Sequence, residues 1–95
     1  MQGISITELC ERIMYSHEAE FIYDGATYML QPIATDEKAW LIIDCVDTSK
    51  RLCQHEIPMS GNIPQSVIDA VLSEKCFNGK SFVEIEKEIT VTVIY

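Results

Sequence analysis

The pattern of apolar and polar positions predicts a helix near the start of the chain. Between Ser5 and Ser16, apolar residues recur every three or four positions, while charged residues occupy the other face. Ser5 and Glu8 have the spacing of a capping box, and Glu8 lies one helical turn before Arg12 with the opposite charge. The segment therefore carries its own start signal and one apolar face for a core.

Two strands follow and form a hairpin. Residues 20–32 hold two β-prone runs around an Asp-Gly dipeptide, which supplies the positive φ angles of a two-residue turn. The turn predicts that Tyr23 pairs with Ala26 and Phe21 with Tyr28. These aromatic side chains should then share one face of the hairpin.

The middle of the chain predicts a second pair of strands. Residues 39–46, AWLIIDCV, are apolar without alternation, which indicates a strand in the centre of a sheet. A polar turn, DTSK at 47–50, leads into another strand pattern at 51–57. Short links of this kind join antiparallel neighbours.

The last third predicts two helices and a strand. Asn62 is expected to cap the first helix, with Pro64 in its first turn, and Ser81 with Glu84 forms a second capping-box pattern. Residues 89–95 then alternate as a strand without a charged side chain. The order α-β-β-β-β-α-α-β predicts one α+β domain, residues 1–95, with helices packed on an antiparallel sheet of about five strands.

The uncharged terminal strand needs protection, because a long exposed edge of this kind aggregates. We expect it to lie inside the sheet, to be covered, or to pair with a second copy of the chain. In the last case the interface would contain Val91, Val93 and Tyr95.

Composition excludes several classes of partner. The formal net charge is −8, from 15 acidic and 7 basic residues, and no stretch gathers Lys or Arg into a phosphate-binding stripe. We therefore expect no nucleic-acid partner. No apolar run is long enough to span a bilayer and the first residues lack a signal peptide, so we expect a cytoplasmic protein without a membrane partner. Its four cysteines should then be reduced.

The stretch LCQHEI, residues 52–57, raises the question of a reactive site. Cys53 and His55 point to one face of a strand. If the loop consists of residues 47–50, Asp44 lies opposite Cys53, which assembles the residue types of a nucleophile, a base and an orienting acid. A slip of one residue would instead bring Cys45 opposite Cys53, as a thiol pair or half of a zinc site.

We favour a structural role for Cys53 and His55. The spacing Cys45-x7-Cys53-x-His55 does not match the close cysteine pairs of known zinc sites. A reactive thiolate also needs nearby cations, whereas this region is acidic and apolar. The sequence therefore predicts no catalytic residue, no metal and no cofactor.

Two stretches resemble a known group of proteins. EFIYDGATYML, with a Glu-Phe-x-Tyr-x-Gly-x-x-Tyr hairpin, and FNGKSFVEI, a helix start, are similar to segments of small bacterial cytoplasmic proteins of uncharacterised activity. The resemblance extends over most of the chain and describes its fold. It implies no activity, cofactor or catalytic residue.

Two functional hypotheses follow. The first is a small acidic interaction or regulatory module without catalytic activity, which binds a protein partner or forms a homodimer through the terminal strand. The second is a small enzyme or a ligand or metal binder that uses Cys53, His55 and Asp44, or an aromatic face made of Tyr23, Tyr28 and Trp40. The position of these side chains in the fold separates the two.

Overall fold

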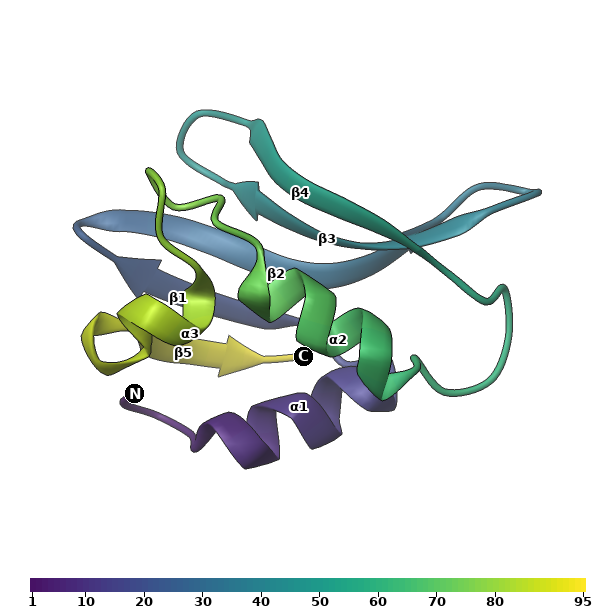
Figure 1. The fold of residues 1–95 in the computed structure, drawn as a ribbon, viewed down its shortest axis with the longest axis horizontal. Helices are drawn as coiled ribbons and strands as arrows, with labels where there is room; N and C mark the ends of the chain where they lie inside the picture. The colour runs from purple at the N-terminus through teal and green to yellow at the C-terminus, as the bar shows by residue number, and fades with distance from the viewer.

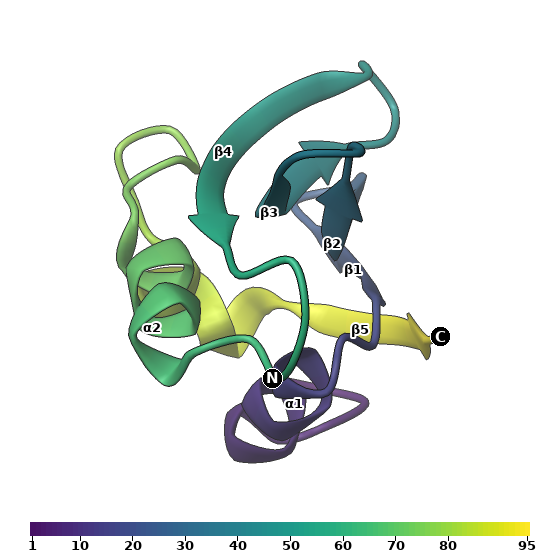
Figure 2. The ribbon, with the colours of Figure 1, turned by 90° about the vertical axis from the view of Figure 1, so that its right-hand side faces the viewer.

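The computed structural model describes residues 1–95 as one five-stranded antiparallel sheet with its helices on one face (Figures 1 and 2). This architecture confirms the predicted α+β class and the predicted order of elements. No helix has both the length and the apolar character needed to cross a membrane. The elements are α1 (Ile6–Met14), β1 (Ala19–Tyr23), β2 (Ala26–Ala34), β3 (Ala39–Cys45), β4 (Lys50–Ile57), α2 (Gln65–Ser73), α3 (Phe82–Ile85), a 3-10 turn (Glu86–Glu88) and β5 (Thr90–Ile94).

The strands lie in the order β4-β3-β2-β1-β5, and each neighbouring pair is antiparallel. The turn between β1 and β2 has positive φ at Asp24 and Gly25. Its register pairs Tyr23 with Ala26 and confirms the predicted hairpin. Because β5 returns to pair with β1, the C-terminal strand forms one edge of the sheet and β4 forms the other.

Two of the three expected helix caps are present. The Ser5 hydroxyl accepts a hydrogen bond from the Glu8 amide at 3.1 Å, and Ser81 forms the full capping box with Glu84. The predicted cap at Asn62 is wrong, because α2 begins three residues later and no side chain caps it. The Ile63 amide instead donates to the Met14 carbonyl at 2.9 Å, which holds the segment before α2 against the end of α1.

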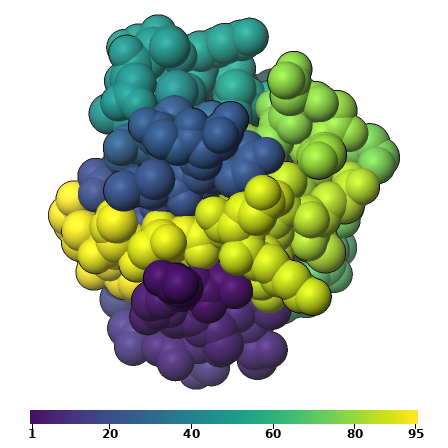
Figure 3. Space-filling model, turned by 90° about the vertical axis from the view of Figure 1, so that its left-hand side faces the viewer, coloured from purple at the N-terminus to yellow at the C-terminus, as the bar shows by residue number.

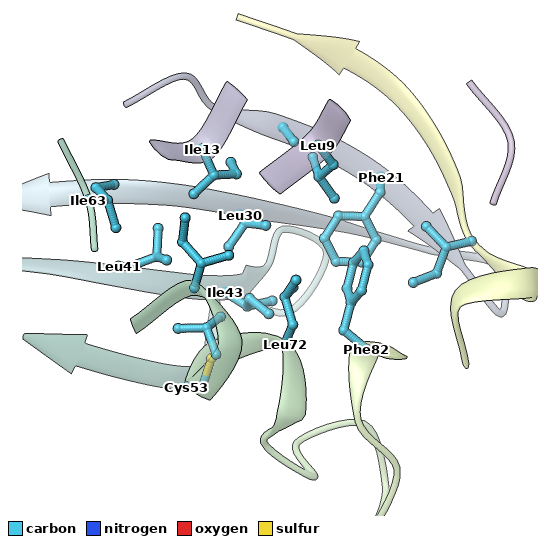
Figure 4. Close-up of a cluster of buried hydrophobic side chains, with 14 of the residues drawn as sticks. Leu9, Ile13, Phe21, Leu30, Leu41, Ile43, Cys53, Ile63, Leu72 and Phe82 are labelled. Carbon is cyan, nitrogen blue, oxygen red and sulfur yellow. The ribbon is translucent and has the colours of Figure 1, made fainter. Parts of the chain in front are cut away.

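A single core joins the helices to one face of the sheet (Figure 4). Leu9 and Ile13 of α1 and Leu72 of α2 face Leu30 and Ile43 from the central strands. These five side chains expose at most 4% of their surface. The apolar stripe of α1 predicted from its periodicity is therefore the surface that packs on the sheet.

Aromatic rings attach the segment after α2 to the sheet. The ring of Phe82 meets that of Phe21 edge to face, with centroids 5.2 Å apart. Phe77 packs in the same manner on Tyr28 at 5.3 Å and on Tyr23 at 5.8 Å. These rings position the loop between α2 and α3, which is otherwise closed by a turn at residues 77–80.

The opposite face of the sheet carries no helix (Figure 2). Ile42 of β3 lies on this face and is nevertheless fully buried, with Gln31 and Gln54 as its cross-strand neighbours. Trp40 lies on the same face and is half-buried. Side chains of the sheet itself therefore cover Ile42, which explains why the sequence of β3 shows no polar alternation at this point.

The terminal strand β5 is an edge strand whose first half is covered. The Gln2 amide donates to the Ile89 carbonyl at 3.0 Å, and the Val91 amide donates to the Gln2 carbonyl at 2.9 Å. Figure 3 shows the N-terminal residues against the C-terminal segment. Gly3 approaches so closely that a Cβ atom there would lie 2.2 Å from the Val91 carbonyl oxygen. Of the proposed interface residues, Val91 is buried, while Val93 and Tyr95 are exposed.

We predict that Ile42→Ala lowers the free energy of unfolding by about 2–5 kcal/mol, because it removes a fully buried side chain. The matched control is Ile22→Ala, since Ile22 lies on the same open face but is 40% exposed. We expect this control to cost about 1 kcal/mol or less. Urea unfolding followed by circular dichroism measures both values, and equal losses would contradict the burial of Ile42.

Candidate functional site

The register of β3 and β4 decides which side chains meet at LCQHEI. Cys45 pairs with Lys50 and Asp44 with Arg51, and a bulge then places Cys53 opposite Ile43. Both expected registers are wrong, since neither Asp44 nor Cys45 lies opposite Cys53.

The loop that joins these strands begins at residue 46, one residue earlier than predicted. Long-range hydrogen bonds hold it there. The Val46 amide donates to the Thr27 carbonyl at 2.9 Å, and the Thr27 amide donates to the Asp47 carboxylate at 3.0 Å. The start of the loop is thereby tied to β2, which the loop sequence alone does not reveal.

Asp44 cannot orient His55 in this fold. Its side chain lies on the face without helices and accepts a hydrogen bond from Arg51 Nε at 2.9 Å. Cys53 and His55 share the opposite face of β4, as predicted, so the proposed set of nucleophile, base and acid is not assembled. Trp40 is likewise separated from Tyr23 and Tyr28, whose rings pack on Phe77.

Cys53 and His55 meet two residues that follow α2. The sulfur atoms of Cys53 and Cys76 and a carboxylate oxygen of Glu74 all lie within 4.8 Å of one another. His55 Nε2 lies 2.6 Å from Glu74 Oε1. We call these four residues the thiol cluster. Cys53 is buried, whereas the other three side chains are partly exposed.

The backbone after α2 turns both Glu74 and Cys76 toward β4. Glu74 caps the C-terminus of α2, and the Cys76 amide donates to the Glu74 carbonyl at 2.9 Å. Lys75 between them forms an ion pair with Glu84 of α3 at 2.8 Å. Phe77, which directly follows Cys76, packs its ring on the aromatic side chains of the sheet. Contacts on both sides of Cys76 thus fix its position beside Cys53.

The two thiols of the cluster differ in acidity. The neighbouring Cys76 sulfur, together with burial, raises the pKa of Cys53. The neighbouring Cys53 thiol lowers the pKa of Cys76. Cys76 is therefore the sulfur that ionises more readily, and Cys53 is a poor nucleophile in the folded chain.

The sequence contained no local signal for Glu74 and Cys76. Cys76 follows Cys53 by 23 positions and comes after a helix, outside any close cysteine pair. Only the packing of the segment after α2 against β4 brings these residues together. A hollow of about 290 Å³ borders the cluster, and its lining includes Cys76, Tyr23, Tyr28 and Leu52.

A second feature is a groove between α1 and α2, which lie side by side and antiparallel (Figure 1). We call it the helix groove. Its volume is about 550 Å³. Its apolar lining consists of Ile6, Cys10 and Met14 from α1, Leu72 from α2 and Val83 from α3. A cavity of this size lies within the range of natural binding sites.

Carboxylates stand on both sides of the helix groove. Glu11 belongs to α1 and Asp69 to α2, and neither forms an ion pair with Lys or Arg. Asp69 accepts a hydrogen bond from the Gln65 amide group at 2.8 Å. Burial and the nearby Asp69 charge raise the pKa of Cys10 at the base of the groove. The groove is therefore apolar at its base and negative at its rim.

Comparisons with protein-family models, curated proteins and solved structures find no match. The fold and its two features define an α+β domain with an acidic helix groove and a separate thiol cluster. Function is therefore inferred from the geometry and charge of the chain itself.

We predict that iodoacetamide modifies Cys76 in the reduced, metal-free native protein and modifies Cys53 only after unfolding. Cys53 is 5% exposed, whereas Cys76 is partly exposed and has the lowered pKa. Peptide mass mapping before and after addition of urea measures this order. Rapid modification of native Cys53 would contradict it and would restore the nucleophile hypothesis.

Proposed function

We propose that the chain is a small, non-catalytic interaction module that binds a basic, amphipathic helix of a protein partner in the helix groove. The observation that carries this proposal is the apolar base of the groove between two unpaired carboxylates, Glu11 and Asp69. A helix in a groove presents apolar side chains at positions i, i+3, i+4 and i+7. Its flanking Lys or Arg side chains would then meet the acidic rim.

The dimensions of the groove agree with such a ligand. From Ile6 to Met14 the first wall extends about 12 Å along the helix axis, which matches two turns of a bound helix. A neighbouring hollow shares Ile6 and Val83 and so lengthens the apolar surface. Its charged residues add no unpaired carboxylate, because Glu84 pairs with Lys75, Glu86 pairs with the N-terminal amine, and the remaining one is Lys87. The overall charge of −8 would also draw a basic partner to the protein.

We place this interaction in the cytoplasm. The lack of an apolar spanning segment and the resemblance to small bacterial cytoplasmic proteins support this location. Fractionation of the native host measures it.

We predict that a synthetic leucine-lysine amphipathic helix binds the protein, and that Val83→Lys weakens this binding at least about tenfold, equivalent to about 1.4 kcal/mol. The new charge would enter the apolar part of the groove. Isothermal titration calorimetry measures the affinity. The matched control is Val46→Lys, because Val46 is similarly exposed but lies outside the groove.

The same experiment tests the charge of the partner. A leucine-glutamate helix of the same pattern should bind more weakly than the lysine helix, and added salt should weaken the lysine helix. The proposal would be contradicted if both helices bound with equal affinity, or if Val83→Lys and Val46→Lys lost the same affinity for the lysine helix. Binding of a small apolar molecule instead of either helix would contradict it as well.

A homodimer through β5 is a second proposal, supported by the exposure of Val93 and Tyr95 on the free half of this edge strand. If it forms, Val93→Lys should shift the protein to monomer, because the new charge would enter the interface. Sedimentation velocity over a range of concentrations measures this shift. A purely monomeric unmodified protein would exclude the dimer, and the pairing of Gln2 with β5 already limits the free edge to its last residues.

A further inference from the structure

We propose that the thiol cluster is a zinc site in which Cys53, Glu74 and Cys76 are the ligands and His55 orients Glu74. This site lies between β4 and the end of α2, outside the helix groove. The proposal is independent of the interaction proposed above.

The distances suit one small ion. The two sulfur atoms and the carboxylate oxygen lie within 4.8 Å of one another. Zinc binds sulfur at about 2.3 Å and carboxylate oxygen at about 2.1 Å, so the donors of a tetrahedral site lie roughly 3.6–3.8 Å apart. The donor atoms therefore lie at most about 1.2 Å farther apart than in a tetrahedral zinc site.

The donor types select the class of metal. Two thiolates and one carboxylate form a mixed soft and hard set, which favours zinc. Calcium and magnesium prefer sites composed entirely of oxygen. Copper(I) prefers a set of sulfur atoms without the carboxylate.

His55 supplies the support that zinc ligands usually have. Its Nε2 atom lies 2.6 Å from Glu74 Oε1, close enough for Nε2–H to donate to the carboxylate. Such outer partners fix the orientation of a ligand, and their loss typically weakens metal binding 10- to 100-fold. We therefore assign His55 as a positioning residue.

The backbone around the cluster holds its donors in place. Cys53 is a buried side chain of β4, and Glu74 and Cys76 belong to one tight turn that aromatic packing and the Lys75–Glu84 ion pair both anchor. Cys76 also lines the adjacent hollow of about 290 Å³ and is itself partly exposed, so solvent reaches the cluster at this residue. Three protein ligands leave one position of a tetrahedral ion for water, which can enter along this route.

The test is metal titration of the reduced, full-length protein after removal of metal with a chelator. We expect native mass spectrometry to show one zinc ion per chain. Cobalt(II), used as a spectroscopic probe at the same site, should produce sulfur-to-cobalt charge-transfer absorption. Cys76→Ser should weaken zinc binding at least about 100-fold and remove this absorption, because a thiolate ligand is lost.

Further variants separate ligands from neighbours. Glu74→Gln should weaken zinc binding, because it replaces a carboxylate ligand with a neutral amide. His55→Ala should weaken zinc binding about 10- to 100-fold, but the sulfur-to-cobalt absorption should remain at saturating cobalt, because both thiolates are kept. Cys10→Ser and Cys45→Ser are the matched controls, because these cysteines lie outside the cluster, and both should bind like the unmodified protein. If Cys53→Ser fails to fold, the partly exposed Cys76 still provides the test.

Three results would overturn the proposal. The first is the absence of stoichiometric zinc in the reduced protein, and the second is full zinc binding by Cys76→Ser. The third is a disulfide between Cys53 and Cys76 in the purified protein, seen as a mass lower by two hydrogen atoms, together with no metal binding after this disulfide is reduced. That result would identify a redox pair instead of a metal site. Because His55, Glu74 and Cys76 all lie outside the helix groove, their substitution should leave the binding of the lysine helix unchanged even if the metal site fails.

Discussion

The packing of Phe77 and Phe82 on the sheet is the interaction on which both candidate sites depend. Phe77 lies between α2 and α3, and Phe82 is the first residue of α3. Their rings meet those of Phe21, Tyr23 and Tyr28 with centroid distances from 5.2 to 6.2 Å. Such aromatic pairs contribute about 0.5–1.5 kcal/mol each beyond the area that they bury. Phe77 directly follows Cys76, and Phe82 directly precedes Val83. The same aromatic packing therefore fixes the position of Cys76 in the thiol cluster and of Val83 in the helix groove.

Features whose cause lies within a few residues could be predicted from the sequence. The hairpin around Asp24-Gly25 and the helix starts at Ser5 and Ser81 were correct, because the backbone conformation and the capping hydrogen bonds are local. Asn62 shows the limit of this reasoning. A distant hydrogen bond from Ile63 to Met14 holds the chain extended there, and α2 starts only after Pro64.

The candidate site depends on contacts that no local pattern contains. The register of β3 and β4 follows from hydrogen bonds between Thr27 and the loop at residues 46 and 47, together with a bulge near Cys53. The alternation of a strand did predict that Cys53 and His55 share a face. Their partners, Glu74 and Cys76, reach them only through tertiary packing, so the sequence indicated half of the cluster and the wrong acid.

The ion pairs show which carboxylates of this acidic chain have a basic partner and which do not. Four of the seven Lys and Arg residues already pair with carboxylates, namely Arg12, Lys38, Arg51 and Lys75. Glu11 and Asp69 keep no basic partner beside the apolar groove, and Glu74 pairs only with His55 beside two thiols. Other carboxylates also lack a Lys or Arg partner, but Glu11 and Asp69 lie beside an apolar groove and Glu74 lies beside two sulfur atoms. The first arrangement favours an organic cation such as a Lys-rich helix, whereas the second favours a metal ion, so the same excess of acid supports two chemically different partners.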